Sequence, residues 1–149
     1  MSARLFARLL GAALLLGAIC GFIPQLLVSG ATIHPLSLDT PHDQLFSLFP
    51  VNPLDNIVHA GLGLWGLFAS RSHRLATRFA RWMGGILLAL TFGGFVPAFG
   101  DVLPLYGNDI WLHALLALTA AYFGWVHRSA PDLALTRPDN VSPDQPPLS

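Results

Sequence analysis

Long apolar stretches alternate with shorter polar segments along this chain. Four of the stretches approach or exceed the roughly 18 residues that a helix needs to cross a bilayer. They cover residues 5–27, 54–70, 82–100 and 109–127. The pattern therefore predicts an all-α integral membrane protein, a four-helix bundle that forms one domain over residues 1–128.

The segments between and after these stretches differ in character. Residues 29–52 form a long outer loop, and within it "TPHDQLFSLF" predicts a short interfacial helix over residues 41–49. Thr40 suits the N-cap of that helix, and a proline follows at its first position. Residues 129–149 are rich in Pro, Asp and Ser, so this tail cannot bury a core and we expect it to be disordered.

Composition and charge strengthen the membrane interpretation and orient the chain. Hydrophobic residues make up 53% of the sequence and charged residues only 11%, whereas a soluble domain carries about 25% charged residues. The eight basic residues are all arginines, and none lies in the loops that follow the first and third stretches: Arg4, Arg8, Arg71, Arg74, Arg78, Arg81, Arg128 and Arg137. The positive-inside rule then predicts that both termini and the 71–81 loop are cytoplasmic.

The second and fourth stretches begin with related sequences. "LFPVNPLDNIVHAG" aligns with "VLPLYGNDIWLHAL", which pairs Asp55 with Asp109 and His59 with His113 at a constant offset (113 − 59 = 54). The stretches before them contain the similar sequences "GFIP" and "GFVP". We therefore predict two helix-pair repeats of the same orientation, related by a pseudo-twofold axis along the membrane normal. Both Asp–His pairs would then lie at one depth, near the outer surface.

Small residues follow each histidine on the same helical stripe. They are Gly63 and Gly66 in the second stretch, and Ala117 and Ala120 in the fourth. In a bilayer such stripes mark close helix packing, because association there depends on direct contact. The stripes predict that the Asp–His pairs point into the bundle, as buried ionisable groups should.

Two interpretations of the polar positions stay open. The candidate site consists of the pairs and their neighbouring asparagines: Asp55, Asn56, His59, Asn108, Asp109 and His113. The first interpretation is structural, since an aspartate at a helix N-terminus binds free N–H groups and the histidine one turn later can pair with it. The second is a ligand site, in which imidazoles and carboxylates hold a divalent metal or two histidines hold haem.

Other functions have weaker support in the sequence. A transporter needs polar groups along a path, but Thr91 and Thr119 are the main polar residues deeper in the helices, and a threonine can bond to its own helix. There is no phosphate loop and no nucleophile elbow, so we do not expect an enzyme. The arginines are too few to indicate nucleic-acid binding. The lipid bilayer is the expected partner, and a second copy or another membrane protein is left open.

At the repeated motifs the chain resembles an uncharacterised bacterial membrane family, domain of unknown function 4383. The resemblance covers residues 5–127 and rests on "GFIP", "LFPVNPLDNIVHAGLGLWGL" and "GNDIWLHALLALTAAYFG". Asn56 and His59 match the first family motif, and Asp109 and His113 match the second. Many relatives have an asparagine three residues before the second histidine, where this chain has Ile110. The resemblance implies a four-span protein of the bacterial inner membrane and implies no activity.

Overall fold

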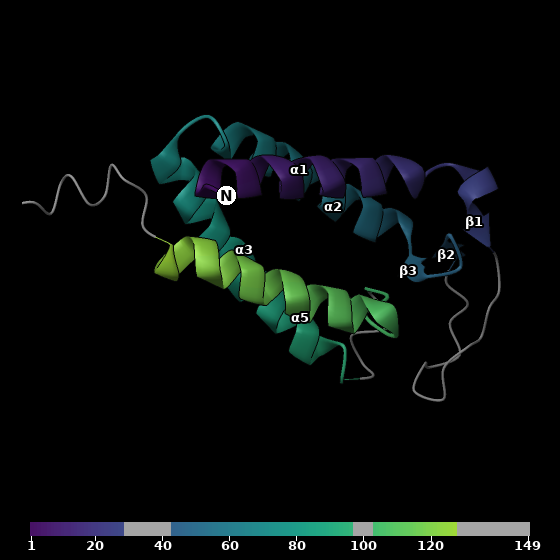
Figure 1. The fold of residues 1–149 in the computed structure, drawn as a ribbon. Helices are drawn as coiled ribbons and strands as arrows, with labels where there is room; N and C mark the ends of the chain where they lie inside the picture. The colour runs from purple at the N-terminus through teal and green to yellow at the C-terminus, as the bar shows by residue number, and fades with distance from the viewer. Residues whose placement is uncertain (29–42, 97–102, 128–149) are drawn as a thin grey trace, which may run out of the picture.

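Four long helices account for most of the chain that the structure describes, which is residues 1–28, 43–96 and 103–127 of a computed structural model (Figure 1). Besides them this part contains a 3₁₀ turn, η1 (Pro24–Leu26), and three short strands. The helices are α1 (Ala3–Cys20), α2 (Pro53–Ala69), α3 (His73–Gly93) and α5 (Asn108–Ala121), which a π-helical turn, η2 (Tyr122–Val126), continues.

Side-chain caps decide where three of the helices begin. The side chains of Ser2, Asn52 and Ser72 each accept a hydrogen bond from a backbone N–H in the first turn of α1, α2 and α3. Such caps satisfy N–H groups that have no partner within the helix. The cap of α5 is Gly107, whose φ of 65° lies in the region that favours glycine.

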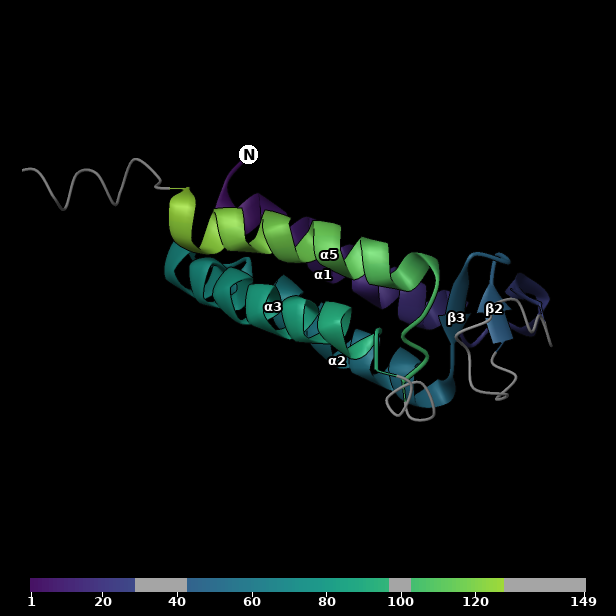
Figure 2. The same ribbon diagram turned by 90° about the horizontal axis from the view of Figure 1, so that it is seen from below.

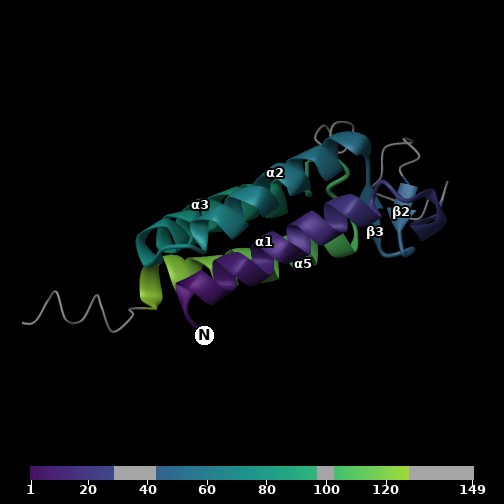
Figure 3. The ribbon, with the colours of Figure 1, turned by 90° about the horizontal axis from the view of Figure 1, so that it is seen from above.

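Consecutive helices run in opposite directions along a common axis. The most extensive contacts join α1 to α2 and α3 to α5, and α3 also packs on α1 and α2. The start of α1, the turn between α2 and α3, and the end of η2 lie at one end of the molecule (Figures 1 and 2). The strands lie at the other end, which Figure 3 shows beside the start of α2.

A small antiparallel sheet closes this second end. It contains β1 (Leu27–Val28), β2 (Asp43–Leu45) and β3 (Phe49–Val51) in the order β1-β2-β3, with Leu45 opposite both Leu27 and Phe49. Between β2 and β3, Phe46 and Ser47 have positive φ angles, and the Leu48 N–H donates to the Leu45 carbonyl at 3.0 Å. Positive φ at both central residues is the signature of a tight hairpin turn.

The predicted interfacial helix over residues 41–49 is wrong for residues 43–49, which form a strand, a turn and a second strand. The spacing of its apolar residues fits a helix and a hairpin equally well. The hairpin forms because β2 finds backbone partners on both sides, in β1 and β3. These long-range pairings override local preference. The other predicted features of the loop and the tail, over residues 29–42 and 129–149, lie outside the described residues.

The predicted bounds of two helices also need correction, whereas α2 and α5 with η2 agree closely with the stretches 54–70 and 109–127. The first helix ends at Cys20 rather than residue 27, because Gly21 caps it and Pro24 cannot continue it. The third begins at His73 rather than residue 82, because Ser72 caps it. The arginine-rich segment 71–81 is therefore mostly helical.

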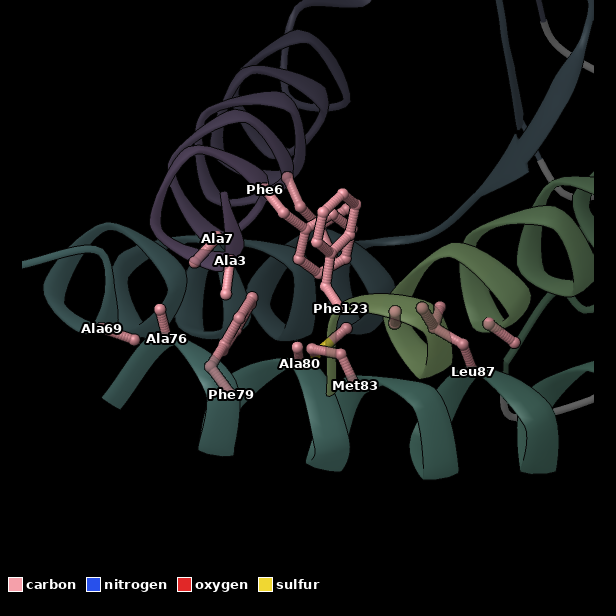
Figure 4. Close-up of a cluster of buried hydrophobic side chains, with 13 residues drawn as sticks. Ala3, Phe6, Ala7, Ala69, Ala76, Phe79, Ala80, Met83, Leu87 and Phe123 are labelled. Atoms are coloured by element: carbon pink, nitrogen blue, oxygen red, sulfur yellow. The ribbon is translucent and has the colours of Figure 1, made fainter. Parts of the chain in front are cut away.

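The apolar core lies between the helices, towards the end where the chain starts (Figure 4). The rings of Phe6 and Phe123 stack there with centroids 5.1 Å apart, and Phe79 meets Trp65 edge-on at 5.0 Å. Seven of the thirteen core residues are alanines: Ala3, Ala7, Ala69, Ala76, Ala80, Ala117 and Ala120. Since alanine projects so little from the backbone, these positions let the helices approach closely.

Glycines bring α1 and α2 into backbone contact. A Cβ atom on Gly11 would lie 2.7 Å from the Leu67 nitrogen and 2.8 Å from the Gly63 oxygen. A Cβ atom on Gly63 would lie 2.8 Å from the Leu15 nitrogen, and one on Gly66 would lie 2.9 Å from the Gly11 Cα. Gly63 and Gly66, two of the predicted packing positions, therefore lie directly against α1.

Large apolar side chains are exposed on all four long helices. They include Leu9 and Leu16 on α1, Leu64 and Phe68 on α2, Leu88 and Phe92 on α3, and Leu115 and Leu118 on α5. Two described helices, Ala3–Cys20 and Asn108–Val126, are long and apolar enough to cross a membrane. The chain is thus mostly helical, with an apolar exterior and two candidate spans.

The glycine contacts predict a position-specific response on α2. Gly63→Ala should lower the free energy of unfolding by about 1–3 kcal/mol, because its methyl group would meet the α1 backbone. Gly61→Ala is the matched control, since nothing lies within 4 Å of a Cβ atom there. Thermal unfolding in detergent measures both variants, and equal stability would show that α1 and α2 do not approach as described.

Candidate functional site

Each Asp–His pair lies in the first two turns of its helix, at the end of the molecule that carries the sheet. The Asp55 Oδ2 lies 3.2 Å from the His59 Nδ1, and the Asp109 Oδ2 lies 3.4 Å from the His113 Nδ1. A spacing of four residues places the two side chains on one face, one turn apart. An aspartate in the first turn also lies at the positive end of the helix dipole.

The second pair is more enclosed than the first. The side chain of His113 is 7% exposed, whereas that of His59 is 26% exposed. Among the described residues, the His113 Nδ1 is buried without a hydrogen-bond partner. The 3.4 Å contact with Asp109 is therefore close enough for charge interaction but is not oriented as a hydrogen bond.

The two pairs lie within electrostatic range of each other. Asp109 interacts with both Asp55 and His59, and His113 also interacts with both of them. The charges of α2 and α5 thus influence each other, although the corresponding residues of the two pairs are 54 positions apart in the sequence (113 − 59 = 54). The structure thus shows two Asp–His pairs, each within one helix, whose charges act on each other at longer range.

Asn56 bonds to α1 rather than to the Asp–His pairs. Its side chain is buried, and its Nδ2 donates to the Gly21 carbonyl at 2.8 Å. Gly21 caps the end of α1, and a Cβ atom there would overlap the side-chain amide of Asn56. Gly21 therefore makes the space that the asparagine fills, and the bond ties the start of α2 to the end of α1.

The second half of the chain has an apolar version of this contact. Gly94 caps α3 as Gly21 caps α1, and a Cβ atom on Gly94 would lie 2.6 Å from the Ile110 Cγ1. Ile110 aligns with Asn56 in the repeated motif. Ile110 thus occupies the same place in the packing as Asn56, with a branched apolar side chain instead of an amide.

Asn108 joins α5 to the hairpin. Its Nδ2 donates to the Leu48 carbonyl at 3.4 Å, and the residue is exposed. It borders a cavity of about 160 Å³ between the hairpin and the start of α5. The other lining residues are Gln44, Ser47, Leu48, Pro50, Tyr106 and Gly107. Partial burial in this region raises the pKa of the Tyr106 hydroxyl.

The described residues do not fit either cofactor that the sequence left open. No three His, Cys, Asp or Glu side chains in the described ranges are arranged to hold a metal ion. A flat group such as haem would need space beside the small residues, but α1 fills the space at Gly63 and Gly66. Ala117 and Ala120 likewise belong to the apolar core. The small residues therefore pack helices together.

The threonines give transport no support. The Thr91 and Thr119 hydroxyls each donate to the carbonyl four residues earlier, at 2.8 Å in both cases. They bond to their own helices, as the sequence predicts, and do not continue the polar groups of the Asp–His pairs into the molecule.

Sequence reasoning missed two arginine contacts at the opposite end. The Arg4 Nε donates to the Ser70 carbonyl at 3.0 Å, and the Arg81 Nε donates to the Gly124 carbonyl at 2.7 Å. Ser70 and Gly124 align in the repeat, and both lie where a helix ends or its last turn begins to unwind. A cation there suits the negative end of the helix dipole. The sequence therefore contains a signal for these contacts, namely arginines close to expected helix ends.

Fold and site together define a helical protein with two candidate membrane spans, two Asp–His pairs at one end and arginine contacts at the other. The model of a family described as a domain of unknown function (DUF4383) matches residues 4–126, and the chain belongs to this family. The finding confirms the resemblance seen in the motifs. No curated protein and no solved structure matches the chain.

The contact between Gly21 and Asn56 predicts a coupled response. Gly21→Ala should destabilise the protein by about 1–3 kcal/mol, because its methyl group would overlap the buried side-chain amide of Asn56. Asn56→Ala should cost about 1–2 kcal/mol through the lost hydrogen bond. The double variant should lose less than the two single losses combined, since removing the amide makes room for the methyl group.

Thermal unfolding of the two single variants and the double variant in one detergent measures this coupling. Gly17→Ala is the control, because nothing lies within 4 Å of a Cβ atom there and the position is on the same helix. Strictly additive losses for Gly21 and Asn56 would contradict the contact.

Proposed function

We propose that the protein is an integral, multi-pass protein of the bacterial inner membrane with a structural or interaction role. The observation that carries the proposal is the apolar exterior of all four long helices. In α1 and in α5 with η2, only 33% and 28% of the candidate span is buried. A core helix of a soluble protein would be mostly covered, whereas lipid is the solvent that suits exposed Leu, Phe and Trp.

The separation of charge supports an orientation. The described arginines lie at the end where the chain starts, and the described aspartates, Asp43, Asp55 and Asp109, lie at or near the sheet. The positive-inside rule then places the start of α1, the turn between α2 and α3, and the end of η2 on the cytoplasmic side. The sheet and the Asp–His pairs would lie at the outer side.

Matching contacts in the two halves support the repeat. A Cβ atom on Gly11 would lie 2.7 Å from the Leu67 nitrogen, and a Cβ atom on Gly84 would lie 3.4 Å from the Ala121 nitrogen. Leu67 and Ala121 align in the repeated motif. Together with the Gly21–Asn56 and Gly94–Ile110 contacts, this favours two equivalent helix pairs in a four-helix membrane bundle.

The Asp–His pairs then stabilise the association of α2 with α5 at the outer end of the bundle. Ionisable side chains at the edge of a bilayer are stable when they pair with one another and face the protein interior. Each pair lies within one helix, but the pairs also interact between α2 and α5. Loss of one histidine leaves its aspartate without that partner and weakens the interaction between the two helix pairs.

Reporter fusions test the membrane topology. A reporter active only in the periplasm should be silent when it is fused after residue 127 and active when it is inserted between residues 29 and 42, because the arginine end is cytoplasmic. A cytoplasm-specific reporter at the same two sites is the control and should give the opposite pattern. A periplasmic signal after residue 127 would overturn the orientation, and release of the intact protein from membranes by alkaline carbonate would overturn the membrane assignment.

Histidine variants test the interaction between the two Asp–His pairs. His59→Ala and His113→Ala should each destabilise the protein in detergent, and the double variant should be less than additive by about 0.5–3 kcal/mol because the pairs interact. Combining His59→Ala with His73→Ala is the control, since His73 begins α3 at the opposite end and the losses should add. Additive losses for His59 and His113 would show that the two pairs act independently.

A further inference from the structure

Six arginines form a basic collar around one end of the molecule. The collar comes from the start of α1, the turn after α2 and the first turns of α3, and its members are Arg4, Arg8, Arg71, Arg74, Arg78 and Arg81. All six are exposed. They belong to two segments that are far apart in the sequence, residues 4–8 and 71–81. The antiparallel course of the helices brings these segments to the same end (Figure 1).

The arginines of the collar differ in the contacts that their side chains make within the protein. Arg4 and Arg81 bond to helix carbonyls through Nε, and the Arg71 guanidinium lies over the Phe68 ring at 5.1 Å. The side chains of Arg74 and Arg78, one turn apart on α3, point to the exterior. The three described aspartates lie towards the other end, so the described part of the chain offers this collar no carboxylate at its own end.

Large exposed aromatic residues adjoin the collar. Trp82 follows Arg81 directly and is 66% exposed, and Trp125 follows Gly124, the residue whose carbonyl Arg81 binds. Phe68 is exposed beside Arg71. A basic rim with tryptophans beside an apolar helix surface has the layered chemistry of a membrane interface, where aromatic rings lie at headgroup depth. A soluble anionic partner would not require the tryptophans.

We propose that the basic collar binds the headgroups of anionic phospholipids. The proposal rests on the proposed membrane location and adds a lipid class to it. The guanidinium groups donate hydrogen bonds to phosphate oxygens, the adjoining tryptophans lie against the glycerol and upper acyl region, and the apolar helix surface lies against the chains. Arginines close to an anionic leaflet each strengthen its attraction by about fivefold in affinity.

A lipid titration in neutral detergent tests the proposal without requiring that the protein span a membrane. Short-chain phosphatidylglycerol and phosphatidylcholine are added separately to the purified full chain, and tryptophan fluorescence and the unfolding temperature are followed. Phosphatidylglycerol should bind more tightly than phosphatidylcholine. In Arg74→Gln/Arg78→Gln this preference should fall by about 25-fold, since two cations are lost. Arg74→Lys/Arg78→Lys should keep most of it.

Several outcomes would overturn the proposal. They are an equal response of the unaltered protein to both lipids, an unchanged preference in the glutamine variant, and a loss in the lysine variant as large as in the glutamine variant. Saturation of the same response by inorganic phosphate would assign the collar to a free anion instead. The topology reporters test the membrane location separately, so failure of one proposal is distinguishable from failure of the other.

Discussion

The close approach of α1 and α2 is the contact on which the rest of the structure depends. Gly11, Gly63 and Gly66 remove side chains from the interface, so the two backbones meet directly. Seven of the thirteen core residues are alanines, so the helices can approach closely around the larger Phe, Leu and Met side chains. Backbone contact between α1 and α2 adds to this packing, which is how helices associate when their outer surface is apolar.

Close packing leaves little space for polar groups between the helices, and these groups lie at the two ends of the molecule. Arg4 and Arg81 bond across to the ends of α2 and η2 at one end, and the Asp–His pairs lie at the start of α2 and α5 at the other. Between them the threonine hydroxyls bond to their own helices. Within residues 1–28, 43–96 and 103–127, these threonines do not join the polar groups of the two ends into a continuous path.

The two halves use the same positions with different chemistry. At the end of the first helix in each pair, a glycine receives a side chain from the following helix, which is Asn56 in one half and Ile110 in the other. Only the asparagine bonds to the α1 carbonyl. The more enclosed histidine, His113, lies in the half with the isoleucine. The two glycine contacts therefore differ in polarity, and the two histidines differ in exposure.

The sequence by itself determined α2 and α5 almost to the residue, the family and the pairing of each aspartate with the histidine one turn later. The helices and the pairings are local features, because apolar periodicity and a four-residue spacing act within one helix. Tertiary structure alone decided that residues 43–51 form a hairpin, since β2 needs β1 and β3 as partners. It also decided that Asn56 bonds to Gly21 and that α1 fills the space at Gly63, because both depend on how closely two helices approach, a distance that no pattern within one helix contains.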